Sequence, residues 1–298
     1  MGQPVPPTCV RHPDRPTGLA CTRCGRPACP ECLRPAAVGQ HCVDCFQAQP
    51  VQSARTLVAK ARPVATYGLI AISVALYAIT AAQSHDLMNN QRGSSLFWDM
   101  ALVPYLVAQG EWYRVIGSGF LHFGAVHLAF NMFALWVVGR DLERVLGWAR
   151  FLAVYLVALL GGSAAVMVGS GALTATAGAS GALYGVFGAV AVALLRLKQS
   201  PTPMLILIAI NLVITFSLPG ISLWGHLGGL VAGTACAVGI LFVPEWLSAR
   251  TSQQAARLGW LSVAVVAVVC IAVTLGAAVY LRANPPVMAA MLSQSAGF

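Results

Sequence analysis

Charged residues are scarce in this sequence of 298 residues. Only 9% are Asp, Glu, Lys or Arg, whereas a soluble domain usually carries about a quarter. Hydrophobic residues make up 58%, which excludes an ordinary soluble protein and indicates an integral membrane protein. Acidic residues are missing from the apolar segments except near their ends, which disfavours a proton pump or ion carrier. The net charge of +9 does not indicate nucleic-acid binding, because Lys and Arg mark the cytoplasmic side of membrane proteins.

Seven apolar segments follow residue 60 and predict an all-α polytopic membrane protein. Most are long enough to cross about 30 Å of hydrocarbon as a helix. The fourth and fifth are short, which suits helices sheltered among others, and the fourth is rich in the Gly and Ala that allow close helix packing. The predicted segments are 64–83, 119–138, 149–169, 179–195, 203–218, 222–243 and 258–281.

Basic residues gather in alternate connections between these segments. Lys and Arg precede the first segment, separate the second from the third, follow the fourth and separate the sixth from the seventh. The positive-inside bias therefore predicts a cytoplasmic N-terminus and an extracytoplasmic C-terminus, and we expect the plasma membrane of a bacterium. The connection 84–118 then lies outside, and its apolar and aromatic residues suit the membrane interface.

The polar first fifty residues contain four pairs of metal-ligating residues, each with two residues between its members. Each pair can hold one side of a tetrahedral zinc ion, and two pairs complete one site. We predict two structural Zn²⁺ ions, with the first pair joined to the third and the second to the fourth. His41 is an alternative to Cys42 for one position. The predicted ligands are Cys9, His12, Cys21, Cys24, Cys29, Cys32, Cys42 and Cys45.

A disulfide framework is the alternative interpretation of these cysteines, but a cytoplasmic segment is reducing. A module of this size could hardly fold on hydrophobic burial alone, so bound metal would supply its stability. The pattern resembles a B-box-type zinc finger, which implies binding or tethering, with a cytoplasmic protein as partner. Complete ligation leaves no open position for catalysis. The other two cysteines, Cys236 and Cys270, are expected to be packing residues.

A few polar side chains lie inside the apolar segments, where they are costly. Each one alone suits a structural role, but their spacing indicates more. His127 and Asn131 are four residues apart and share a helix face. Tyr184 has the same relation to Ser180. Glycine strips accompany Ser180, in "GASGALYGVFGA", and His226, in "WGHLGGLVAG"; they predict that these two helices pack closely enough for a hydrogen bond between the two side chains.

Four motifs in this order resemble the rhomboid intramembrane serine proteases: "EWYR" at 111–114, "H-x4-H-x3-N" at 122–131, "GASG" with Tyr four after the Ser, and "HLGGLVAG" at 226–233. The resemblance implies a six-helix core, with the zinc module and the seventh segment as additions. We expect four regions: a zinc-binding module at 1–50, a linker at 51–63, the protease core at 64–243, and a cytoplasmic loop, seventh helix and outer tail at 244–298.

The resemblance assigns the catalytic roles to a dyad. Ser180 matches the family nucleophile and His226 its general base, without an acidic third member. Tyr184 matches the residue that stacks against the base. A dyad without an acidic member agrees with the absence of Asp and Glu from the apolar segments, except near their ends.

The resemblance also names the supporting residues. The histidine and asparagine of the oxyanion site correspond to His127 and Asn131, together with the backbone N–H of the nucleophile. His122 matches a residue that supports the outer loop and the second helix, and Arg114 matches a structural arginine of that loop. Tyr113 separates Trp112 from this arginine, whereas some members have the two adjacent.

The activity implied is an intramembrane endopeptidase that needs no cofactor for catalysis. Its substrates would be transmembrane proteins in the lipid bilayer, cut near the outer ends of their transmembrane segments. Two alternatives remain open from the residues: a small-solute transporter with a polar path, and a non-catalytic binder of membrane proteins. Either alternative would keep its function without the hydroxyl of Ser180.

Overall fold

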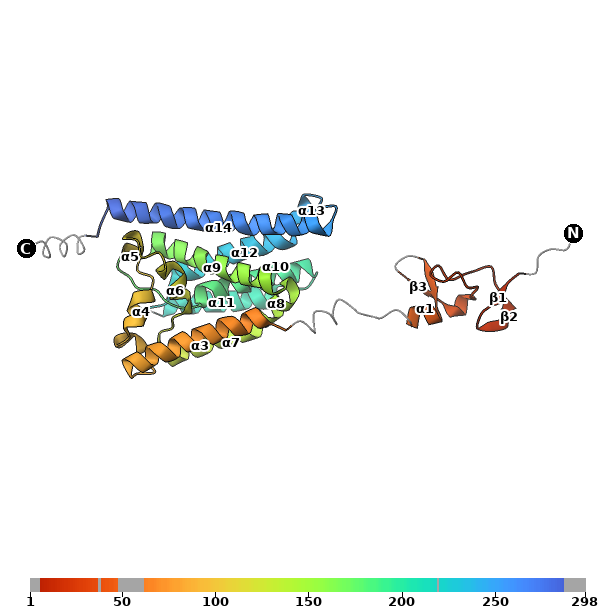
Figure 1. Ribbon diagram of the computed structural model, residues 1–298, viewed down its shortest axis with the longest axis horizontal. Coiled ribbons are helices and arrows are strands. Elements are labelled where there is room, and N and C mark those ends of the chain that lie inside the picture. The colour runs from red at the N-terminus through yellow and green to blue at the C-terminus, as the bar shows by residue number, and fades with distance from the viewer. Residues whose placement is uncertain (1–5, 37–38, 48–61, 219, 287–298) are drawn as a thin grey trace, which may run out of the picture. The chain divides into compact units, whose positions relative to one another are not determined.

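The computed structural model describes residues 6–36, 39–47, 62–218 and 220–286. The chain divides into two compact units, residues 1–60 and 61–298. Small strands dominate the described part of the first unit, and helices dominate the second (Figure 1).

Two small antiparallel sheets form the first unit. Its buried cluster is mostly cysteine: Ala28 and Leu33 are the buried members that are not. Hydrophobic burial is therefore small in this unit. The elements are β1 (Thr8–Cys9), β2 (His12–Pro16), η1 (Pro30–Cys32), β3 (Leu33–Pro35), β4 (Gln40–Cys42) and α1 (Val43–Gln47).

The second unit is a bundle of long helices with several short ones at its two ends (Figure 1). The short helices of the 84–118 connection gather at one end. In chain order the elements are α3 (Val64–Ser84), η2 (Asn90–Arg92), α4 (Ser95–Met100), α5 (Pro104–Ala108), α6 (Arg114–Gly117), η3 (Ser118–Phe120), α7 (Gly124–Ala134), the π-helical turn η4 (Leu135–Gly139), α8 (Arg140–Leu146), α9 (Trp148–Gly169), α10 (Ser180–Arg196), α11 (Thr202–Ser217), α12 (Leu223–Leu241), α13 (Val243–Trp246) and α14 (Ser252–Ala283).

Four of the described helices, α3, α9, α12 and α14, are long and apolar enough to cross a membrane. The pair 114–120 and 124–146, which is bent by 91°, gives a fifth span when its two parts are counted as one. The predicted second segment therefore contains a break, which ends at Gly124 with φ 79°, a conformation that glycine adopts readily. The helices α10 and α11 are shorter, as predicted. The all-α polytopic class is confirmed.

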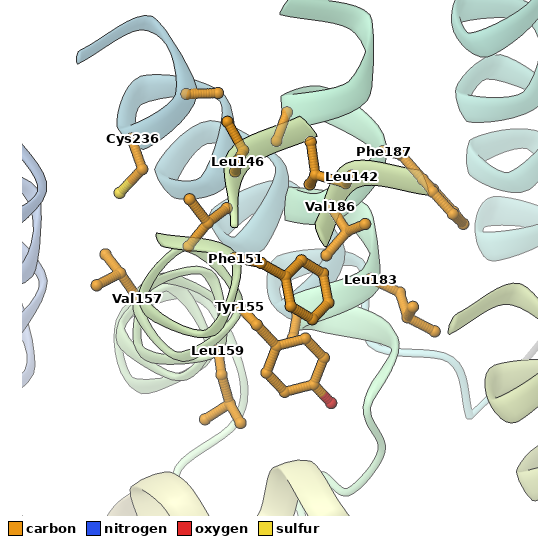
Figure 2. Close-up of a cluster of buried hydrophobic side chains, with 14 of the residues drawn as sticks. Leu142, Leu146, Phe151, Tyr155, Val157, Leu159, Leu183, Val186, Phe187 and Cys236 are labelled. Carbon is orange, nitrogen blue, oxygen red and sulfur yellow. The ribbon is translucent and has the colours of Figure 1, made fainter. Parts of the chain in front are cut away.

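The core lies among α9, α10 and α12, with contributions from α3, α7 and α8. Figure 2 shows the rings of Phe151 and Tyr155 on α9 within this cluster, with Val186 of α10 close by. Cys236 is fully buried in the same cluster, and Cys270 is buried beside α9 and α12. Both cysteines are packing residues, as expected.

Glycines set the distance between α10 and α12. A methyl group added at Gly229 would lie 1.9 Å from the carbonyl oxygen of Gly181, and one at Gly233 would lie 2.4 Å from Cα of Gly185. Only hydrogen atoms fit there, so the two backbones are in contact. The prediction that the two glycine strips face one another is confirmed.

The seventh long helix, α14, supports the connection that precedes the second span. The side chain of Arg282 donates a hydrogen bond to the backbone carbonyl of Ala108 at the end of α5. Ala278, on the preceding turn of α14, is buried in a cluster with Val107 and Val115. The helix thus fixes α5 against the bundle.

Candidate active site

Ser180 is the first residue of α10 and is half-buried. The loop reaches it through Gly178, whose φ of 136° suits glycine. The Ser180 Oγ lies 2.8 Å from Nε2 of His226. The structure therefore brings together the two residues that the sequence pairs, across 46 positions of chain.

His226 lies in the first turn of α12, where the Ser222 side chain caps the helix by accepting a hydrogen bond from the N–H of Gly225. The imidazole is buried, and the ring of Tyr184 stacks on it at 4.1 Å between centroids and 15° between planes. Tyr184 comes one helical turn after Ser180. The stacking partner expected from the sequence is thus in place.

The other ring nitrogen of the histidine has a partner that the sequence did not reveal. Nδ1 of His226 lies 2.8 Å from Oγ1 of Thr215, near the end of α11. Among the polar residues of this segment Asn211 stands out, but its amide donates to the carbonyl of Leu207 within its own helix. A threonine in an apolar helix usually bonds only its own backbone, so nothing in the local sequence marks Thr215.

His127 borders Ser180 through its ring edge. Its Nδ1 accepts a hydrogen bond of 3.2 Å from the backbone N–H of Phe123, so a neutral ring carries its proton on Nε2. A methyl group at Gly178 would lie 3.1 Å from that Nε2 and 3.6 Å from Oγ of Ser180. The two side chains therefore flank one small space beside the glycine.

Two more of the predicted residues, Asn131 and His122, are buried. Asn131 is buried and gives one amide hydrogen to the carbonyl of His127, at 2.8 Å. Its second amide hydrogen is the one that could reach an oxyanion, so that role stays a prediction. His122 is fully buried, with its ring edge-on to His127 at 5.2 Å between centroids.

Arg114 organises the connection outside the bundle. Its buried guanidinium donates to the backbone carbonyls of Trp98 and Ala101, and its Nε lies 2.6 Å from the carboxylate of Glu111. The hydrogen bond from this arginine holds the pKa of Glu111 below its usual range. The arginine thus ties α4 to the start of α6, in line with a structural role.

The first unit gathers its eight candidate ligands into two groups. Within each group the ligand atoms all lie within 4.8 Å of one another. The first pair joins the third and the second joins the fourth, as predicted, and Cys42 rather than His41 belongs to the second group. The groups are Cys9, His12, Cys29 and Cys32, and Cys21, Cys24, Cys42 and Cys45.

The spacing of these atoms fits zinc. Tetrahedral ligands are about 3.8 Å apart for two sulfurs and about 3.6 Å apart for sulfur and nitrogen, given the usual bond lengths. Cys24 and Cys42 have their sulfurs 3.8 Å apart. Nδ1 of His12 lies 3.8, 3.5 and 3.4 Å from the three sulfurs of its group.

The thiols of one group differ in acidity. A backbone hydrogen bond from Cys29 is the main cause that lowers the pKa of Cys9 to about 6. Burial is the main cause that raises the pKa of Cys32 to about 11. A divalent cation would stabilise both as thiolates, the form in which cysteine binds metal.

The comparisons with known proteins concern the helical unit. The Rhomboid domain family matches residues 109–243. Rhomboid protease GluP of Bacillus subtilis is 43% identical over 142 residues, which are 45% of this chain and 28% of the relative. Rhomboid-type serine protease 2 of Emericella nidulans is 35% identical over 154 residues, 48% of this chain and 30% of that relative.

A further similar protein is matched over most of its length. The rhomboid-family protein YdcA of Bacillus subtilis is 32% identical over 178 residues, which are 57% of this chain and 85% of the relative. The chain thus spans less than a third of the first two relatives and most of the third.

Proposed function

The chain belongs to the rhomboid family, and on that premise we propose that it is an intramembrane serine endopeptidase. The observation that carries the proposal is the 2.8 Å distance between Ser180 Oγ and His226 Nε2. A serine hydroxyl is a weak nucleophile until a neutral base accepts its proton. A histidine held at this distance can do so.

The reaction follows from that pair. Oγ of Ser180 attacks the peptide carbonyl and gives its proton to Nε2 of His226. The imidazolium returns this proton to the leaving amine as the C–N bond breaks, which leaves an acyl-enzyme. Water then attacks the ester carbonyl, the same histidine takes the water's proton, and its return to Oγ releases the new carboxyl end.

The surroundings of Ser180 support stabilisation of the oxyanion. The serine begins a helix of 17 residues, so its backbone N–H is one of the donors left unpaired at a helix start, where the dipole is positive. His127 adds an Nε2–H beside Gly178, and we assign Asn131 as a further donor. Donors aimed in advance at the developing charge lower the barrier most in a dry site.

The substrates we propose are transmembrane segments of other membrane proteins. Most Lys and Arg residues of the helical unit lie in the connections on the far side from Ser180, so the positive-inside bias favours a nucleophile near the extracytoplasmic face and an N-terminus in the cytoplasm. A helical substrate hides its scissile carbonyl in a backbone hydrogen bond. Helix-breaking residues near the cut would lower the cost of exposing it.

We assign the first unit a separate, non-catalytic role. Its two groups of four ligands would each hold one structural Zn²⁺ and complete its coordination. A closed site supplies folding energy but offers no position for a substrate. We propose that the unit tethers a cytoplasmic protein.

The proposal is tested with the purified full chain in detergent and a single transmembrane test substrate. We expect a single main cut near the end of the segment that faces outward. Ser180→Ala should give no product above an enzyme-free blank, with an unchanged folded fraction. Persistent cleavage by that variant would contradict the assignment, and a function that survives the substitution would favour a transporter or a non-catalytic binder.

A further inference from the structure

The hydroxyl of Thr215 has more partners than a threonine in an apolar helix needs. It lies 2.8 Å from Nδ1 of His226, 2.8 Å from the carbonyl of Asn211 and 3.2 Å from the hydroxyl of Tyr184. The side chain is buried, at 5% exposed. One hydroxyl that water does not reach freely therefore serves three partners.

The proton count decides the direction of each hydrogen bond. A hydroxyl has one hydrogen and two lone pairs. If Thr215 gives its hydrogen to the Asn211 carbonyl, it must accept from the other two partners. Tyr184 can donate its O–H, and His226 then carries a proton on Nδ1.

We propose that Thr215 is a positioning residue that takes the place of an acidic third member of the site. By accepting from Nδ1–H it holds His226 in the tautomer whose Nε2 has a free lone pair. That lone pair is the one that accepts the proton of Ser180, 2.8 Å away. The inference rests on the proposed protease function, and it adds how the base is oriented.

The position of Thr215 in the fold gives the hydrogen bond a further consequence. Ile208 and Thr215 are the buried residues of α11, a helix described over its whole length. Its neighbouring side chains Val213 and Phe216 are 64% and 71% exposed. The residue that orients the base therefore sits on a helix that buries few side chains against the other helices, and a shift of α11 would withdraw the acceptor from Nδ1.

The direct test is the ring ¹⁵N spectrum of His226 in the full chain, labelled at histidine. The His226 signals are those lost in His226→Gln. We expect the wild type and Thr215→Ser to carry the proton on Nδ1. Thr215→Val keeps the shape without the hydroxyl, and we expect it to lose this preference.

Kinetics give the second readout. We expect kcat to fall about tenfold in Thr215→Val, the size that loss of a neutral hydrogen bond implies, with KM unchanged and with Thr215→Ser restoring most of the rate. Ser217→Ala is the matched control, because Ser217 bonds the carbonyl four residues before it on the same helix but is exposed. Its rate should equal that of the wild type.

Two results would overturn the inference. One is a wild-type His226 with its proton on Nε2; the other is a tautomer that Thr215→Val leaves unchanged. The spectrum needs no proteolysis, so it separates the two proposals. Suppose that the chain cleaves no substrate, that wild-type His226 carries its proton on Nδ1, and that Thr215→Val changes this tautomer. The protease function would then be refuted, and the positioning role would stand.

Discussion

The two units of this protein are stabilised by different means. In the first, five of the buried residues are cysteines, and the apolar ones beside them are Ala28 and Leu33. In the second, large apolar side chains such as Phe151 and Tyr155 fill a core between helices, and glycines bring α10 and α12 into backbone contact.

This difference shows where each unit is vulnerable. With metal bound as we propose, the first unit depends on a few ligand atoms, because the metal would replace the burial that the unit lacks. The helical unit has a large apolar core, but its candidate site depends on direct backbone contact between α10 and α12. Changes in one unit should therefore leave the other intact, and the following substitutions test that separation, ordered by their expected effect on proteolysis.

The largest effect should come from the dyad. We expect Ser180→Ala and His226→Ala each to lower kcat to the level of an enzyme-free blank, and the double variant to be no worse, because the two residues act as a unit. Both variants should keep two zinc ions per chain. Product formation and metal content measured on one preparation check this, and additive losses would argue against a shared step.

The next effect should come from the helix contact behind the dyad. Gly229→Ala puts a methyl group into the carbonyl of Gly181, and such overpacking costs about 1–3 kcal/mol. The added methyl group would push α10 away from α12 and so lengthen the Ser180–His226 hydrogen bond. We therefore expect both kcat and thermal stability to fall.

The matched control for this substitution is Gly276→Ala in α14. A methyl group there meets no atom within 4 Å, and alanine favours a helix by up to about 1 kcal/mol over glycine. We expect full activity and equal or higher stability. Equal losses in the two variants would mean that the glycine contact has no special role.

A smaller effect is expected at the oxyanion site. Removal of one donor typically costs about 10²–10³ in rate, and because we propose several donors for the oxyanion we expect Asn131→Ala to lose less. The loss should appear in kcat and leave substrate binding unchanged. A parallel loss of binding, measured by substrate cross-linking to the Ser180→Ala background, would make Asn131 a structural residue.

The smallest effect on proteolysis should come from the ligand groups of the first unit. Cys29→Ser and Cys42→Ser each remove one ligand of a different group, so each should reduce the zinc content from two ions to one. His41→Ala should retain both. A chain that begins near residue 55 should hold none and still cleave a test substrate in detergent.

Three outcomes would contradict these expectations for the first unit. If the folded, truncated chain failed to cleave, zinc binding would be coupled to the active site. If the full chain bound one ion, the assignment of eight ligands to two ions would be wrong. Loss of both ions on Cys42→Ser alone would show that the two groups fold as one unit.

Much of this architecture follows from the sequence, because its signals are local. The length of each apolar segment determines where a helix can span a membrane. The two-residue spacing between cysteine and histidine ligands determines which two ligands form a pair. A separation of four residues places His127 and Asn131 on one face. The pairing of Ser180 with His226 crosses 46 positions, yet glycine strips on both helices mark it in advance.

Other contacts have no local signal in the sequence, and only the tertiary structure determines them. Thr215 lies 11 residues before His226, across a connection whose path the sequence does not encode locally, and its i−4 backbone bond resembles that of any helical threonine. Arg282 reaches the carbonyl of Ala108 across 174 positions. A helix determines which residues share its own face, but only the packing of all helices determines what each face meets.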